Sequence, residues 1–229
     1  MDNFKEIPIV LNNFNRVTLL KGMINDLQNR GYRNIHILDN QSTYPPLLQF
    51  YKELQEGNQV TIKYLDRNYI QNALWDCGYN LQFCGRYNWI VYSDSDLELN
   101  GLLPENFIDT LINKATQWGF KKAGFALKID DLPDTLWGNT NREWEAKYWV
   151  DKLEENVYNA KIDTTFAVIR PGDGLLFDAI RLAGDFTARH IPWYLDLTNL
   201  DNVEEKYYLA QSHDYSTSAR FYREHYKNR

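Results

Sequence analysis

The 229-residue sequence is poor in cysteine, and this shortage excludes two classes of protein. Cys77 and Cys84 are its only cysteines, too few for the disulfide framework of a small secreted domain. Their spacing of seven also differs from the C-x-x-C pattern of redox and zinc sites. Both fall on one apolar stripe of a helix predicted over 69–84, so we expect two buried thiols.

Glycine-rich loops and long apolar runs are also missing. No G-x-G-x-x-G occurs, which disfavours a dinucleotide site, and LNNFNRVTLL (11–20) lacks the glycines of a nucleotidyltransferase phosphate loop. No window approaches the roughly 20 apolar residues that span a bilayer. The start MDNFKEIPIVLNN lacks the features of a signal peptide. We therefore expect a cytoplasmic protein without a transmembrane segment, and leave a peripheral membrane association open.

An excess of basic residues is absent as well. The net charge of −6 and the pI near 5.3 argue against a broad phosphate-binding surface, so we expect no nucleic-acid partner. The hydrophobic fraction of 44% is sufficient for one sizeable core. Because no repeat, low-complexity tract or flexible linker divides the chain, we expect a single domain over 1–229.

Apolar runs alternate with helical patterns along the first hundred residues. Strands are predicted at 7–12, 34–39, 59–65 and 88–93, with helices between them from Asn15 as N-cap to Gly31, from Pro45 to Glu56, and over 69–84. This alternation predicts an α/β fold with a doubly wound, mostly parallel sheet.

The pattern is looser beyond residue 100. We predict a helix near 104–118, a strand at 121–129, a helix near 141–155 and a strand at 162–170. The last part, which includes 184–200, has no clear periodicity, and we expect a loop-rich lid or acceptor-binding region there.

The stretch NWIVYSDSDLEL (88–99) places Asp94 and Asp96 at the carboxyl end of the fourth strand. Ligands of open α/β sheets bind at such strand ends, and Mg²⁺ or Mn²⁺ is usually held there by one or two carboxylates plus substrate phosphates. In the alternative interpretation, Asp94 caps a turn and Asp96 is only solvated. The position of this single D-x-D, directly after an apolar strand, favours a metal–diphosphate clamp.

Four segments in order resemble family 2-like glycosyltransferases of the GT-A fold, over roughly residues 7–100 with a looser match beyond. They are PIVLNNFNR (8–16), ILDNQS (37–42), LDRNYIQNALWDCGY (65–79) and YSDSD (92–96). The resemblance implies a nucleotide-diphosphate sugar donor, with UDP favoured, and favours inversion at the anomeric carbon. One departure is Asp-Asn at the end of the second strand, where many members have paired aspartates.

The resemblance also implies roles for individual residues. It places Asn12 and Asn13 near the nucleoside, Asp39 on the base or ribose, Arg67 and Asn68 near the donor, and Asp94, Ser95 and Asp96 on the donor and on a Mn²⁺ or Mg²⁺ ion. Local sequence alone is equally compatible with Asp39 as a turn residue and with Arg67 in a surface charge pair.

The stretch ARHIPWYLD (188–196) loosely resembles the segment with which several GT-A enzymes complete the metal site. In this interpretation His190 reaches the metal, Trp193 stacks on a sugar, Asp196 is the general base, and the segment closes over the donor. The alternative is a proline turn with a core tryptophan and a capping Asp196. Asp163 is the second candidate base.

The sequence thus predicts a metal-dependent glycosyltransferase that moves a sugar to a glycan or other hydroxyl acceptor, the chemistry of polysaccharide biosynthesis. Residues 1–100 form the nucleotide-sugar-binding half and 101–229 the acceptor half. Trp137, Trp144 and Trp149 are expected to divide between core packing and acceptor contact. The alternatives are a non-catalytic sugar-nucleotide or glycan-binding module on the same fold and a sugar-phosphate nucleotidyltransferase.

Overall fold

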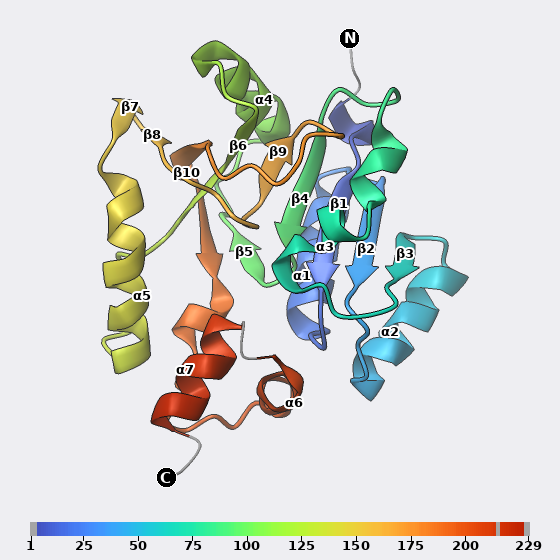
Figure 1. Ribbon diagram of the computed structural model, residues 1–229, viewed down its shortest axis with the longest axis vertical. Coiled ribbons are helices and arrows are strands. Elements are labelled where there is room, and N and C mark those ends of the chain that lie inside the picture. Colours follow the sequence, from blue (N-terminus) through green and yellow to red (C-terminus); the bar gives the residue numbers. More distant parts are fainter. Residues whose placement is uncertain (1–3, 214–215, 227–229) are drawn as a thin grey trace.

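A ten-stranded mixed sheet runs through the computed structural model, which describes residues 4–213 and 216–226 (Figure 1). Its strands are β1 (Ile9–Asn13), β2 (Ile35–Asp39), β3 (Thr61–Tyr64), β4 (Ile90–Asp94), β5 (Leu97–Leu99), β6 (Lys122–Leu127), β7 (Lys152–Glu154), β8 (Val157–Asn159), β9 (Ala167–Ile169) and β10 (Ile180–His190). Their order is β3-β2-β1-β4-β9-β6-β10-β8-β7, and β5 pairs with β10.

Helices cover both faces of this sheet. They are α1 (Thr18–Asn29), α2 (Pro45–Glu56), α3 (Ala73–Asp76), α4 (Phe107–Trp118), α5 (Leu136–Ala146), α6 (Val203–Gln211) and α7 (Thr217–His225), with short 3₁₀ helices η1 (Phe4–Glu6), η2 (Ile70–Asn72), η3 (Tyr79–Phe83), η4 (Lys147–Trp149) and η5 (Ile191–Tyr194). None of these described helices is long and apolar enough to cross a membrane.

Strand β1 shows why the first half folds as predicted. Ile9 and Leu11 pack on one face in a cluster with Leu20 of α1, whereas Val10 packs on the other face with Leu74 of α3. Alternate side chains of a strand point to opposite faces, so a continuous apolar run is what a strand covered on both sides requires. β1 pairs in parallel with β2 and β4, and β2 with β3. The predicted doubly wound α/β fold is confirmed.

The C-terminal half differs from the prediction. β9 is antiparallel to both of its neighbours. Within the region 184–200, predicted to be loop-rich, residues 184–190 instead form the second half of the eleven-residue strand β10. The register of β10 on β6 shifts between Leu182 and Thr187, and Gly184 has φ +65°. A bulge of this kind interrupts the period-two alternation, which hides the strand from pattern analysis.

Two predicted helices are shorter than expected. Over 69–84, Gly78 has the left-handed φ of +70° and ends α3, so the stripe carrying the cysteines does not form. Cys77 is half-buried and Cys84 exposed, and the prediction of buried thiols is wrong. The helix predicted to reach residue 155 ends at Ala146, because the chain then forms the β7–β8 hairpin with Asn156 at φ +60°.

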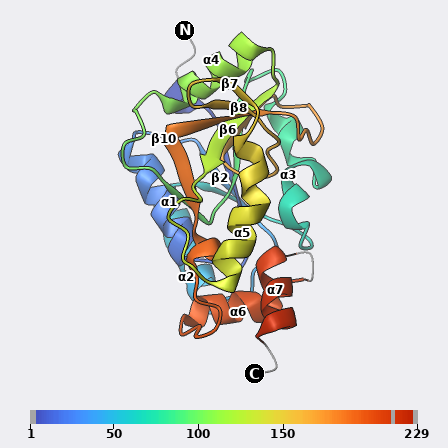
Figure 2. The same cartoon turned by 90° about the vertical axis from the view of Figure 1, so that its left-hand side faces the viewer.

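Asn15 does not cap α1 as predicted. It has φ +51°, and its side-chain oxygen accepts hydrogen bonds from the backbone N–H groups of Thr43 and Tyr44. The cap comes from Glu204 of α6, whose carboxylate accepts from the backbone N–H of Thr18 at 3.1 Å. Helix α6 is thereby attached to the start of α1, and Figures 1 and 2 show α6 and α7 beyond the carboxyl ends of the parallel strands.

Candidate functional site

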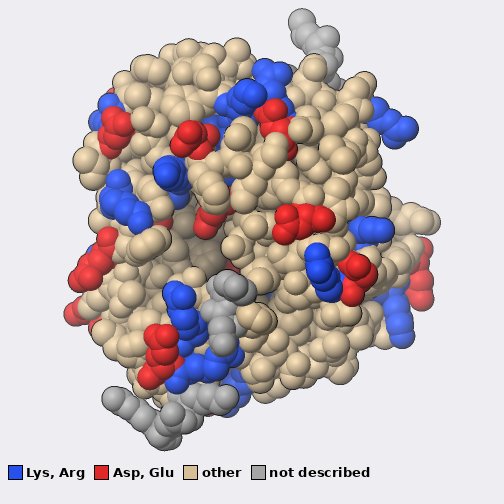
Figure 3. Space-filling view, in the orientation of Figure 1, with Lys and Arg blue, Asp and Glu red and all other residues tan. Residues whose placement is uncertain are grey.

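A pocket of about 670 Å³ lies at the carboxyl ends of β1 and β4, and its lining extends to α5, the end of β10 and helices α6 and α7. Figure 3 shows the hollow on this face, where acidic and basic side chains are intermixed and no large patch of one sign is present. The register of β1 on β4 pairs Asn12 with Asp94, so these polar ends stand side by side at the pocket floor.

Asp94 is the last residue of β4 and is held by two neighbours. One carboxylate oxygen accepts a hydrogen bond from Asn12 Nδ2 at 2.9 Å, and the other accepts from the hydroxyl of Thr164. Burial, with a smaller contribution from the negative charge of Asp96, raises the pKa of Asp94 above its usual range. Asp94 therefore has a fixed orientation and an unusually basic carboxyl group at the pocket wall.

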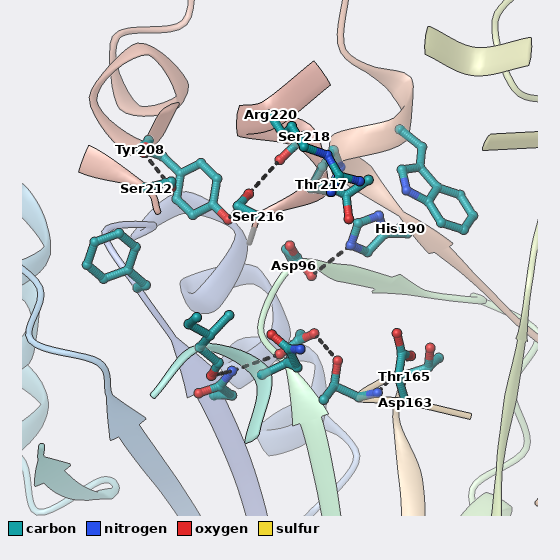
Figure 4. A pocket seen from close by; sticks show the side chains of 18 of the residues that line it. Asp96, Asp163, Thr165, His190, Tyr208, Ser212, Ser216, Thr217, Ser218 and Arg220 are labelled. Atoms are coloured by element: carbon teal, nitrogen blue, oxygen red, sulfur yellow. Dashed lines mark hydrogen bonds and ion pairs between the residues drawn. The ribbon is translucent and has the colours of Figure 1, made fainter. Parts of the chain in front are cut away.

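Asp96 lies between the side chains of Arg16 and His190, and Figure 4 shows His190 facing its carboxylate. Arg16 Nη1 donates to Asp96 Oδ2 at 2.7 Å, and His190 Nε2 lies 3.4 Å from Oδ1. Burial opposes ionisation, but His190 and Arg16 outweigh it and hold the pKa of Asp96 below its usual range. The same arginine forms two hydrogen bonds to Glu205 of α6 and stacks on Tyr208.

Asp96 and His190 supply some, but not all, of the ligand atoms that a divalent cation needs. Asp96 Oδ1 is buried without a hydrogen-bond partner and faces the His190 imidazole, so one oxygen and one nitrogen are available together. Within the described residues no cluster of three or more metal-ligating side chains occurs. A cation held here would take its remaining ligands from substrate phosphate and water, as Mg²⁺ commonly does.

Asp163 is exposed and lines the same pocket, on the segment before β9. The backbone N–H of Thr164 donates to its Oδ1 at 2.7 Å, and the other carboxylate oxygen has no hydrogen-bond donor among the described residues. Behind this segment the buried ammonium of Lys122 donates to the carbonyl oxygens of Ile162, Asp163 and Leu176 at 2.9, 2.7 and 3.0 Å. Asp163 is therefore a free carboxylate on a firmly held backbone.

A second part of the lining comes from Asn12, Asn40, Asn68 and Ile70. Ile70 has φ +58°, a conformation that is unusual for a β-branched residue and that the surroundings must enforce. Asn68 Oδ1 accepts from the Ile70 N–H at 2.8 Å, and Asn12 Nδ2 donates to the Ile70 carbonyl at 3.1 Å. These amides build a rigid polar wall beside Asp94.

Three residues that the resemblance implied at the donor lie elsewhere. The Asp39 carboxylate is buried and accepts from the Tyr51 hydroxyl and from the Ser42 N–H, the turn role that local sequence also allowed. Asn13 is buried too, and donates to the same tyrosine. Arg67 is exposed, stacks on Tyr69 and is not among the residues that line the pocket.

Ser95 does line the pocket, but its hydroxyl donates to Asn13 Oδ1 at 2.6 Å. Asn40, which the sequence did not single out, reaches the pocket in place of the preceding aspartate and donates to Asn12. Asn13 and Asp39 thus lie in a buried layer behind the residues that face the pocket.

Of the three candidate residues between His190 and Asp196, two line the pocket and one does not. His190 and Trp193 line the pocket and make an edge-to-face contact, with ring centroids 4.8 Å apart. Trp193 also packs against two hydrophobic clusters, so much of its surface is covered. Asp196 lies outside the pocket lining, and its carboxylate accepts from the backbone N–H and the hydroxyl of Thr198. The structure separates Asp196 from the other candidates and leaves Asp163 with them.

No protein-family model matches the chain, and a search of curated proteins finds no similar sequence. Solved structures are similar in fold. The mannosyltransferase PcManGT of Pyrobaculum calidifontis, solved with GDP-Man and Mn²⁺, has a TM-score of 0.51 and 10% identity over 80% of this chain. GalNAc-T7, solved with UDP, GalNAc and Mn²⁺, has a TM-score of 0.48 and 13% identity, and S. aureus TarS 0.43 and 9%.

The chain has the GT-A fold. It spans 56% of the length of the PcManGT structure and 43% of that of GalNAc-T7. In a doubly wound sheet, ligands bind beyond the carboxyl ends of the strands. The pocket with Asp94, Asp96, Asp163 and His190 lies at this position in the GT-A fold.

Proposed function

We propose that the chain is a metal-dependent glycosyltransferase that transfers a sugar from a nucleotide-diphosphate sugar to a hydroxyl of a glycan or other acceptor. The observation that carries the proposal is the convergence of Asp94, Asp96, His190 and Asp163 on one pocket at the carboxyl ends of β1 and β4. The presence of Mn²⁺ and a guanosine diphosphate sugar in the PcManGT structure supports the same assignment.

The polar wall of Asn12, Asn40 and Asn68 is proposed to receive the nucleoside. Each amide oxygen has a second lone pair beyond the hydrogen bond that it accepts within the protein, which suits the imide N–H of uracil and the hydroxyls of ribose. The donor is therefore proposed to be UDP-linked. Asn13 lies behind this wall, and its backbone carbonyl accepts a hydrogen bond from the Asn40 N–H at 2.9 Å. Asp39 is buried beside Tyr51 and does not face the pocket.

Asp96 and His190 are the residues proposed to hold Mn²⁺ or Mg²⁺, which when bound stabilises the negative charge that develops on the diphosphate leaving group. His190 and Arg16 together lower the pKa of Asp96 against the effect of burial, and Arg16 fixes the orientation of its second oxygen. Asp94, fixed by Asn12 and Thr164, is proposed to contact the donor sugar.

Asp163 is the proposed general base. It accepts the proton of the acceptor hydroxyl as the hydroxyl oxygen bonds to the anomeric carbon, while the bond from that carbon to the diphosphate oxygen breaks and its electron pair leaves with the nucleotide. Attack from the face opposite the leaving group inverts the anomeric centre. Asp196, outside the pocket lining, is not assigned this role.

Calorimetry with UDP, GDP and dTDP sugars in the presence of Mn²⁺ tests donor binding, and NMR of the anomeric proton tests inversion. Asp163→Asn should lower transfer by roughly two or more orders of magnitude with donor affinity nearly unchanged. Asp196→Asn is the matched control and should keep near-normal transfer.

Failure of every nucleotide sugar to bind would end the proposal. Donor binding without transfer or hydrolysis would favour the non-catalytic binding module on the same fold. Full transfer by Asp163→Asn would remove that residue as the base, and retention of configuration would remove the need for one.

A further inference from the structure

Two large aromatic side chains remain exposed within the pocket lining. Trp144 on α5 is 61% exposed and Phe177, just before β10, is 48% exposed. Exposed aromatic rings are common on surfaces, but two on the wall of one polar pocket are a feature that binding explains better than chance. Neither ring takes part in the donor chemistry proposed above.

The backbone of Phe177 and the residue next to Trp144 are both linked to the segment that carries the proposed base. The backbone N–H of Ile162 donates to the Phe177 carbonyl at 3.0 Å, which places Phe177 across from the residue next to Asp163. Glu145, adjacent to Trp144, forms a buried ion pair with Arg181, whose Nε donates to the Lys161 carbonyl at 2.8 Å. Residues 161–163 are therefore the common anchor of both aromatic positions.

Trp144 has one face already occupied. The ammonium of Lys147 lies 3.1 Å from its ring centroid, the geometry of a cation–π contact. This contact restricts the indole, while most of the residue remains exposed. A restricted aromatic ring binds a ligand face with little further loss of rotamer entropy.

A pyranose ring matches this surface. Its axial C–H groups form an apolar face and its hydroxyls a polar edge, so an aromatic ring and nearby polar side chains bind it together. Thr140 and Asn141, one turn before Trp144 on α5, also line the pocket. The Thr140 hydroxyl donates to the Leu136 carbonyl and the Asn141 amide to the Trp137 carbonyl, so their oxygens can accept hydrogen bonds from sugar hydroxyls. Trp193, by contrast, has much of its surface covered by core packing.

We propose that Trp144 and Phe177 form the acceptor subsite, an aromatic platform on which a sugar ring of the acceptor packs beside Asp163. The proposal rests on the glycosyltransferase function proposed above and adds the class of acceptor: a glycan, presented by its terminal pyranose. The sugar-stacking role expected of Trp193 thereby belongs to Trp144 and Phe177.

The first experiment needs no donor. Saturation-transfer NMR is recorded on the full chain with the methyl pyranosides of glucose, galactose, mannose and N-acetylglucosamine. At least one should bind, and Trp144→Ala and Phe177→Ala should each weaken that binding by roughly tenfold. Trp144→Tyr should recover most of the signal. Tyr64→Ala is the matched control, since Tyr64 is 48% exposed and lies on β3 outside the pocket lining, and it should leave binding unchanged.

The second experiment distinguishes failure of the acceptor subsite from failure of the proposed glycosyltransferase function. With a competent donor, both alanine variants should raise the acceptor KM by about tenfold and leave donor affinity and donor hydrolysis within twofold of the parent. Absence of binding by all four glycosides, or unchanged binding in both alanine variants, overturns the platform. Loss of donor binding in the parent chain would instead overturn the proposed function, whatever the glycosides show.

Discussion

Replacement of Lys122 by methionine tests whether the segment carrying Asp163 is held from behind. The ammonium of Lys122 is 2% exposed and donates to three carbonyl oxygens, those of Ile162, Asp163 and Leu176. Methionine keeps the apolar stem and removes all three donors. The Ile162 carbonyl is then buried without its partner, whereas the other two lie where water can reach them.

An unsatisfied buried acceptor costs about 1–3 kcal/mol, and hydrogen bonds from a charged donor are worth about 1.5–3 kcal/mol each. The variant also no longer pays the desolvation energy of a buried ammonium, which offsets part of the lost hydrogen-bond energy. We therefore expect Lys122→Met to lower the free energy of unfolding by about 3 kcal/mol. In a chain of this size that corresponds to a Tm lower by about 6–12 °C.

Thermal unfolding followed by circular dichroism measures the effect. The matched control is Lys121→Met, because Lys121 is the neighbouring residue but 63% exposed in its side chain, with only a 3.5 Å pair to Asp173. That surface pair is worth about 0–1 kcal/mol. Lys122→Arg retains charged donors and should recover part of the stability. If Lys122→Met is no less stable than Lys121→Met, the three hydrogen bonds do not hold this segment.

Burial lowers the pKa of His36 to about 4. As the pH falls below about 6.5, the histidine is therefore protonated in the unfolded chain before it is protonated in the folded one. The free energy of unfolding should then fall by about 1.4 kcal/mol per pH unit toward pH 4. Urea unfolding at pH 7 and pH 5 should show this loss in the parent and a smaller one in His36→Gln; an equal loss in both would exclude the histidine as its source. Arg16→Met leaves Glu205 buried without its ion-pair partner and leaves Asp96 with His190 alone, and should lower the unfolding free energy by about 3–5 kcal/mol. Unchanged urea unfolding of Arg16→Met would contradict this.

The first half of the fold could be predicted because its signals are local. The apolar runs of β1 and β4 are buried on both faces, and Pro45 stands at the first turn of α2, where a missing N–H does no harm. The same strands carry Asp94 and Asp96 to the sheet edge, so their place in the pocket follows from chain order alone. Where the pattern was interrupted, by Gly78 or by the bulge at Gly184, the predicted elements were wrong.

The rest of the site depends on contacts between distant parts of the chain. Arg16 and Glu205 are separated by 189 positions, and the local sequence around either residue does not predict their contact. The same holds for Thr164, which fixes Asp94 across 70 positions. Because such pairs form only when strands and helices come together, their partners cannot be read from spacing or periodicity.

Single-residue choices at a strand end are the least accessible to sequence. Asp39 is the last residue of β2 and its side chain points into the core beside Tyr51, whereas Asn40, one position later, faces the pocket. Successive side chains of an extended chain alternate in direction, so the functional residue changes with a shift of one position in the register. Asp163 and Asp196 cannot be distinguished by their local sequence either, since both precede a threonine-containing turn. Both carboxylates accept a hydrogen bond from a nearby backbone N–H, but only Asp163 lines the pocket. Its backbone is held there by Lys122, 41 positions away, a contact that the local sequence does not reveal.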